Sequence, residues 1–156
     1  MVQITIEYMI LTPVLIMLIF LLPITANAAM ETYVSSRQTL ELQKVASHLG
    51  SAIQQVYFSL NHDTVAAGAI TSDTAIPPLL EGYKFTVNCT SRLAVESGAT
   101  ILDLNLKLSG SGATTSTSVT LGKNAEWVNS FFWSDSTTAY INATKVGNTI
   151  RLSIEP

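Results

Sequence analysis

Charge and cysteine are both scarce in this sequence. Asp, Glu, Lys and Arg make up 12% of the 156 residues, and the eight Lys and Arg residues form no block. The net charge is −3 at pH 7, so the chain lacks the basic patch that a nucleic-acid partner requires. A single cysteine, Cys89, excludes an intrachain disulfide, so packing or assembly must stabilise the chain.

The longest stretch without any charged residue runs from Tyr8 to Met30. A helix of about 20 apolar residues crosses a hydrocarbon core of about 30 Å, so this stretch is long enough. A removable secretory signal has a basic start and an apolar core of about 7–15 residues. This stretch lacks the former and exceeds the latter, so we expect it to remain in the working protein as a membrane-crossing helix.

A helical pattern continues beyond the apolar stretch. Among polar residues, apolar ones recur every three or four positions: Leu42, Val45, Leu49, Ile53, Val56 and Leu60. We therefore expect one long helix over residues 1–60, apolar on all sides over 1–30 and amphipathic over 31–60. Gly50 is the one weak point in its amphipathic part.

Two prolines, Pro13 and Pro23, lie inside the apolar part of the expected helix. Each removes a backbone N–H donor and crowds the carbonyl four residues before it, which predicts a kink or local loosening. Membrane helices also tolerate proline without any function attached to it. The sequence leaves both interpretations open.

The C-terminal half of the chain predicts a β domain. Residues 61–82 lose the helical period and are small, polar and proline-containing, which predicts a surface connector. Over residues 83–156, five segments alternate apolar and polar residues: 83–89, 101–108, 116–121, 137–143 and 148–154. No helical segment separates them, so the expected fold class is α+β, a long N-terminal helix followed by an antiparallel β-rich head. The amphipathic part of the helix should cover one face of this sheet or small barrel.

No residue pattern typical of an enzyme or a metal site occurs in the sequence. His48 and His62 have neither a cysteine pair nor a Glu-x-x-His motif beside them. Gly110 lies between predicted strands and precedes no helix, so it belongs to no phosphate-binding loop. Cys89 lies on the apolar side of its strand, which indicates a buried structural thiol. We expect no catalytic residues, no cofactor and no metal.

Two sequons for N-linked glycosylation begin at Asn88 and Asn142. Asn88 shares the polar face of its strand with Lys84 and Thr86, which predicts an exposed side chain. Asn142 shares its face with Tyr140, which favours exposure less. We expect a glycan on Asn88 and, on the weaker pattern, a second on Asn142.

The start of the chain, Gln3-Ile4-Thr5-Ile6-Glu7-Tyr8, resembles the Gln-x-Ser-x-Glu-Tyr pattern of archaeal type IV pilins. In that family a prepilin peptidase cuts the class III signal just before the glutamine. The resemblance implies processing between Val2 and Gln3, which makes Glu7 the fifth residue of the mature chain. Thr5 replaces the usual serine, and the family's basic leader is missing, because only two residues precede Gln3. Either the sequence is already nearly mature, or its true start lies further upstream.

The pilin plan, an apolar helix carrying a β-rich head in a "lollipop" arrangement, fits the whole chain. The resemblance implies a single-pass membrane protein that a dedicated machinery with an ATPase assembles into an extracellular homopolymeric filament. The N-terminal helices bundle in the core of such a filament. The expected assembly residues are Glu7, Tyr8, Leu11, Leu15, Leu18 and Leu22. An adhesion pilus is favoured over an archaellin, because the start lacks the Gly, Ala and Val usual in archaellins.

Glu7 is the only charged residue at the start of the apolar stretch. A lone carboxylate in a dry helix bundle costs several kcal/mol unless it is paired, and the first basic residue is Arg37. With the resemblance, this predicts that Glu7 pairs with the α-amino group of a neighbouring subunit. The alternative is a favourable carboxylate in a first helical turn, worth about 0.3–1 kcal/mol.

Two other functional classes also fit the sequence. One is a monomeric, single-span surface protein that displays its β domain and has no need of Glu7. The other is a minor pilin-like protein of a secretion or uptake machine. Filament formation separates both from the main structural subunit of a pilus.

Overall fold

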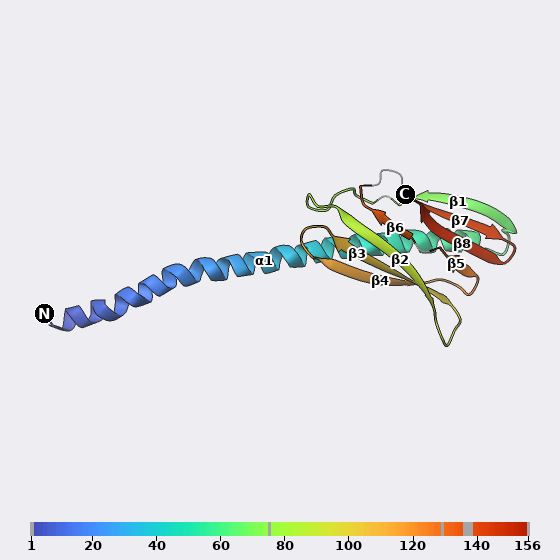
Figure 1. Cartoon of the computed structure of the whole chain (residues 1–156). Coiled ribbons are helices and arrows are strands. Elements are labelled where there is room, and N and C mark those ends of the chain that lie inside the picture. Colours follow the sequence, from blue (N-terminus) through green and yellow to red (C-terminus); the bar gives the residue numbers. More distant parts are fainter. Residues whose placement is uncertain (1, 75, 129, 136–138, 156) are drawn as a thin grey trace. The chain divides into compact units, whose positions relative to one another are not determined.

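The computed structural model describes residues 2–74, 76–128, 130–135 and 139–155, and for residues 2–7 it describes only the backbone. Its compact units are residues 1–37 and 38–156. The predicted α+β class is confirmed, because one long helix is followed by a strand-rich part, residues 67–155, which we call the β unit (Figure 1).

Helix α1 spans Val2–Leu60, in agreement with the predicted extent, and it continues without interruption through Pro13 and Pro23. Every described side chain from Tyr8 to Arg37 is exposed, and burial begins at Gln38. Residues 31–37, which belong to the predicted amphipathic part, are therefore exposed as well. The apolar stripe that packs on the β unit starts only at Leu42, and a polar segment, residues 35–39, precedes it.

In the part of the chain that the structure describes, eight strands form two four-stranded sheets (Figure 1). The order is β1-β7-β8-β5 in one sheet and β4-β3-β2-β6 in the other. The pairings of the described strands are antiparallel, except that β5 runs parallel to β8. The strands are β1 (Ala67–Asp73), β2 (Phe85–Leu93), β3 (Thr100–Leu108), β4 (Thr114–Thr120), β5 (Ala125–Trp127), β6 (Ser130–Trp133), β7 (Tyr140–Val146) and β8 (Thr149–Glu155).

Strand β1 corrects the prediction that residues 61–82 are a connector. It pairs with β7 over its full length, from Ala67 opposite Val146 to Asp73 opposite Tyr140. Its side chains are small or polar and mostly exposed, so they carry little of the alternation that marks a strand. The strand exists because the edge of β7 offers unpaired backbone groups, which a local sequence pattern does not reveal.

Two further strands, β5 and β6, were also missed. They contain three and four residues, too few for a period of two to be recognised. The strand expected over residues 137–143 corresponds to β7, which begins at Tyr140, and residues 137 and 138 lie outside the described residues. The other predicted strands agree with β2, β3, β4 and β8 apart from their ends.

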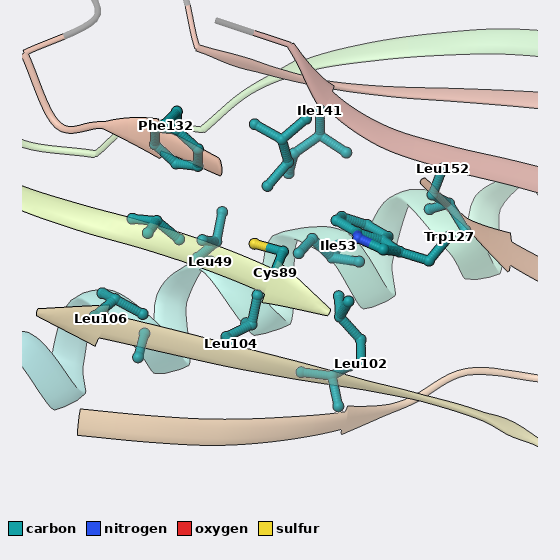
Figure 2. Packing of buried hydrophobic residues seen from close by; sticks show 14 of the residues in the cluster. Leu49, Ile53, Cys89, Leu102, Leu104, Leu106, Trp127, Phe132, Ile141 and Leu152 are labelled. Atoms are coloured by element: carbon teal, nitrogen blue, oxygen red, sulfur yellow. The ribbon is translucent and has the colours of Figure 1, made fainter. Parts of the chain in front are cut away.

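A single hydrophobic core joins the C-terminal part of α1 to both sheets. Figure 2 shows Leu49 and Ile53 of the helix among side chains of β2, β3, β5, β7 and β8. The helix was predicted to cover one sheet face, but its buried side chains contact both sheets. The helical members of the core are Leu42, Ala46, Leu49, Ile53, Val56, Tyr57 and Leu60. Each large one contributes about 1.5–3 kcal/mol relative to exposure.

A polar network fixes the C-terminal end of α1. The Tyr57 hydroxyl donates to Asn124 Oδ1 at 2.6 Å, and Asn124 Nδ2 donates to Asn61 Oδ1 at 2.7 Å. Burial raises the pKa of Tyr57. Any Cβ atom at Gly122 would overlap the Tyr57 hydroxyl, so glycine is required there. The network holds the helix end against the turn that precedes β5.

Candidate functional site: the exposed apolar segment

The most unusual surface of the molecule is the apolar segment, which we define as residues 8–30 of α1. It carries no charged residue, and each of its side chains is exposed. Its large apolar side chains range in exposure from 43% at Leu21 to 77% at Met9. Soluble monomers rarely expose contiguous apolar patches above a few hundred Å², and larger ones mark protein or membrane interaction sites.

Five of the six predicted assembly residues lie in this apolar segment with exposed side chains: Tyr8, Leu11, Leu15, Leu18 and Leu22. Their spacing of three and four residues places them on one face of the helix. For the sixth, Glu7, and for the predicted processing residues Val2 and Gln3, the backbone lies in α1 and the side chains lie outside the described residues.

Thr12 and Thr25 of the apolar segment, and Thr32 just beyond it, bond back into the helix. Thr12 Oγ1 donates to the carbonyl of Tyr8 at 2.8 Å, and Thr32 Oγ1 donates to the carbonyl of Ala28 at 2.9 Å. Thr25 Oγ1 lies 3.0 Å from the carbonyl oxygens of both Leu21 and Leu22. A hydroxyl without a partner costs about 2–7 kcal/mol in apolar surroundings, and back-bonding removes that cost. These polar side chains are therefore compatible with an environment that contains no water.

By length and composition alone, the helix is long and apolar enough to cross a membrane. A run of this length reaches across a hydrocarbon core of about 30 Å. Its chemistry suits either lipid tails or the apolar faces of neighbouring helices, because both surround it with hydrocarbon.

The two predicted glycosylation sites differ in their surroundings. Asn88 is exposed on β2, as its place on the polar face of the strand predicted. Asn142 on β7 is half-buried, and its Nδ2 donates to Glu155 Oε1 at 3.4 Å. The Tyr140 hydroxyl donates to the same carboxylate at 2.8 Å, which lowers the pKa of Glu155 and raises that of Tyr140. Asn88 is therefore the more accessible acceptor.

Cys89 is buried in the core, as predicted. Burial raises its pKa to about 12, so the thiolate that a nucleophile requires is almost absent at neutral pH. His62 Nδ1 lies 2.9 Å from Thr64 Oγ1. Over the described part of the chain, no three His, Cys, Asp or Glu side chains gather in a way that could hold a metal ion.

Sequence reasoning missed one surface, an exposed aromatic pair formed by Phe131 and Trp133 on β6. Their rings contact edge to face, with centroids 6.2 Å apart. The available signal was the pair of aromatics at alternate positions in Phe131-Phe132-Trp133, which a four-residue strand makes hard to recognise.

Comparison of the chain with protein-family models, curated proteins and solved structures gave no match.

Proposed function

We propose that this chain is the structural subunit of an extracellular filament of the archaeal type IV pilus kind. Subunits would be held in the membrane by the apolar segment and then polymerise through it, with the β unit turned outward for adhesion. The observation that carries the proposal is that every side chain of an uncharged apolar segment is exposed, on a chain whose C-terminal part is well packed.

Energetics support an assembled state for the apolar segment. At about 1.5–3 kcal/mol for each large apolar side chain, removing the segment from water yields on the order of tens of kcal/mol. Loss of translational and rotational freedom opposes association by about 4–15 kcal/mol. The gain exceeds this cost, so the free, water-exposed segment is not a stable resting state of the chain.

Movement from membrane to filament needs a different driving force. Lipid tails are as apolar as leucine, so a helix that leaves lipid for a bundle gains little hydrophobic free energy. Close packing and polar pairing must then select the correct position of each subunit. Pairing of Glu7 with the α-amino group of a neighbour supplies such a selection, and an ATPase-driven machinery supplies the work of extraction.

The second candidate function is that of a single-span anchor displaying a monomeric β unit. The length of the apolar segment and its two back-bonded threonines, Thr12 and Thr25, favour this candidate as much as the filament. An archaellin or a minor pilin of a related machine would use the same segment. The candidates differ in whether purified surface material contains filaments built mainly of this chain.

Electron microscopy of shed surface material tests the proposal, with a matched pair of variants. Leu18→Asn places an amide in the apolar segment, and Leu93→Asn makes the same change at an exposed leucine of β2. We expect filaments from Leu93→Asn cells and few or none from Leu18→Asn cells, with both chains in the membrane fraction. Absence of filaments from unmodified cells, or equal filaments from both variants, would overturn the proposal.

A further inference from the structure

The outer face of the β4-β3-β2-β6 sheet carries a regular grid of polar and aromatic side chains. Residues paired across β4, β3, β2 and β6 form rows on this face. One row consists of Ser116, Asn105, Asn88 and Phe131, and the next consists of Thr114, Lys107, Thr86 and Trp133. Strands lie about 4.8 Å apart, so each row extends over roughly 14 Å.

Two open grooves lie on this grid. The first encloses about 480 Å³ and is lined by both rows except Trp133, together with Leu106 and Thr115. The second encloses about 530 Å³, shares Thr86 and Lys107 with the first, and adds Trp133 and the turn at Gly110. Both volumes fall within the range of about 300–1,000 Å³ that is typical of ligand sites.

The chemistry of the lining is selective. It presents the amides of Asn88 and Asn105, several hydroxyls, one cation and the aromatic pair. Among the described residues that line the two grooves, none is a carboxylate. Two carboxylates lie two residues along the chain from the grid, and both have partners. Asp103 on β3 accepts from Arg92 Nε at 2.7 Å and from the Ser118 hydroxyl at 2.8 Å, and Asp135 accepts from Lys84 Nζ at 2.6 Å. These contacts lower the pKa of both carboxylates.

A saccharide matches this combination better than the other common ligands. Its ring has an apolar face of C–H groups that packs on an aromatic ring, and a rim of hydroxyls that requires donors and acceptors. Amide and hydroxyl side chains both donate and accept, so they can satisfy such a rim. A peptide that extends the sheet would instead pair with an outer edge, β4 or β6, and would leave the face that carries the grid uncovered.

We propose that this grid, from Ser116 to Phe131 and from Thr114 to Trp133, is a saccharide-binding surface. Phe131 and Trp133 pack against sugar rings at one end, and Asn88, Asn105 and Lys107 bond their hydroxyls along the rows. The surface lies entirely within residues 38–156, so this proposal does not depend on filament formation.

The saccharide could come from either of two sources. Asn88 is itself a sequon asparagine among the residues that line the first groove, with Phe131 directly opposite it on β6. A glycan attached to Asn88 begins on the grid and lies along it. A free polysaccharide from another surface would occupy the same grooves when Asn88 is unmodified.

A binding assay with the full chain in detergent tests whether a free polysaccharide occupies the grid. The chain is produced in a host without N-glycosylation and offered immobilised hexamers of glucose, mannose and N-acetylglucosamine. We expect at least one hexamer to bind, and Phe131→Ala and Trp133→Ala to weaken that binding at least tenfold. Phe58→Ala, which removes an exposed aromatic from α1, is the matched control and should leave it unchanged.

Tryptophan fluorescence of the natively produced chain tests whether a glycan attached to Asn88 occupies the grid. The chain has two tryptophans, and Trp127 is buried, so acrylamide quenching reports mainly on Trp133. A glycan that lies on the grid makes Trp133 harder to quench than in Asn88→Gln from the same cells. The proposal is overturned if no hexamer binds and Trp133 is quenched equally in both chains. It is also overturned if hexamer binding survives both aromatic substitutions or is lost equally in Phe58→Ala.

Discussion

Gly50 of helix α1 packs directly against Val119 of strand β4. A Cβ atom at position 50 would lie 2.8 Å from Val119 Cγ2 and 3.6 Å from Leu104 Cδ1. The sequence alone marked Gly50 as a weak point of the helix, because glycine lowers helix propensity. The structure gives it a packing role instead, since the absence of a side chain lets the helix approach β3 and β4.

Gly50→Ala should therefore destabilise the chain even though alanine is the better helix former. Overpacking costs about 1–3 kcal/mol, and the gain in helix propensity returns about 0.5–1 kcal/mol. We expect a net loss of about 1–2 kcal/mol in urea unfolding of the full chain in detergent. Val119→Ala opens the space that the added methyl needs, so the double variant should lose at least about 1 kcal/mol less than the sum of the single losses. Additive losses would show that Gly50 and Val119 are not in tight contact.

The sequence predicted those parts of the fold that depend on local side-chain periodicity. The alternation of Leu102, Leu104, Leu106 and Leu108 identified β3, and the spacing from Leu42 to Leu60 identified the buried face of α1. It missed β1 and the parallel pairing of β5 with β8, because these depend on backbone groups offered by strands distant in the sequence. The charge-free apolar segment was visible in the sequence for the same local reason.

Deleting residues 1–30 should yield a soluble, folded monomer. Among the described residues, the buried core draws its helical members only from Leu42 onward, so no described side chain of the deleted stretch contributes to it. We expect a β-rich circular dichroism spectrum, a cooperative thermal transition and the mass of a monomer by light scattering. The full chain without detergent is the control and should aggregate. An unfolded or polymeric truncated chain would contradict the separation of roles between the apolar segment and the β unit.

Because of Cys89, the free energy of unfolding should fall as the pH rises above about 9. Burial raises its pKa from the ordinary 9.0 to about 12, so the folded state retains the thiol proton that the unfolded state releases. This stabilisation is complete below about pH 9 and is lost as the pH rises toward 12, by up to about 1.4 kcal/mol per unit. Cys89→Ala should remove that part of the slope in urea unfolding between pH 8 and pH 10. An unchanged slope, or rapid reaction of the native thiol with a disulfide reagent, would contradict burial as its cause.

Glycosylation should favour Asn88 over Asn142. Asn88 is exposed on β2, whereas Asn142 is half-buried and bonded to Glu155. Intact-mass measurement of the native chain should show a mass above that of the polypeptide, and Asn88→Gln should remove more of the excess than Asn142→Gln. A native mass equal to that of the bare chain would exclude a glycan at both sites. A larger loss from Asn142→Gln would reverse the order that exposure predicts.

The contact between β2 and β6 shows which part of the saccharide surface could not be predicted from the sequence. Asn88 was identified as a sequon, but its position opposite Phe131 follows from pairing between segments more than forty residues apart. Conversely, the assembly residues of the apolar segment needed no tertiary information, since their helical spacing alone places them on one face. Local patterns thus identified the apolar surface, while the polar grid required the sheet order.

Glu7→Gln gives the sharpest test of filament assembly. The substitution keeps the shape and hydrogen-bonding capacity of the side chain but removes its charge. If Glu7 pairs with the α-amino group of a neighbour, a misplaced subunit leaves two unpaired ions in hydrocarbon, at several kcal/mol each. Without the carboxylate this selection is lost, so we expect normal membrane insertion with few or no filaments.

Glu31→Gln is the matched control, because Glu31 is the next carboxylate along α1 and is exposed beyond the apolar segment. Its filaments should be normal by electron microscopy. Abundant, well-ordered filaments from Glu7→Gln cells would show that Glu7 only stabilises the start of the helix, an effect of about 0.3–1 kcal/mol.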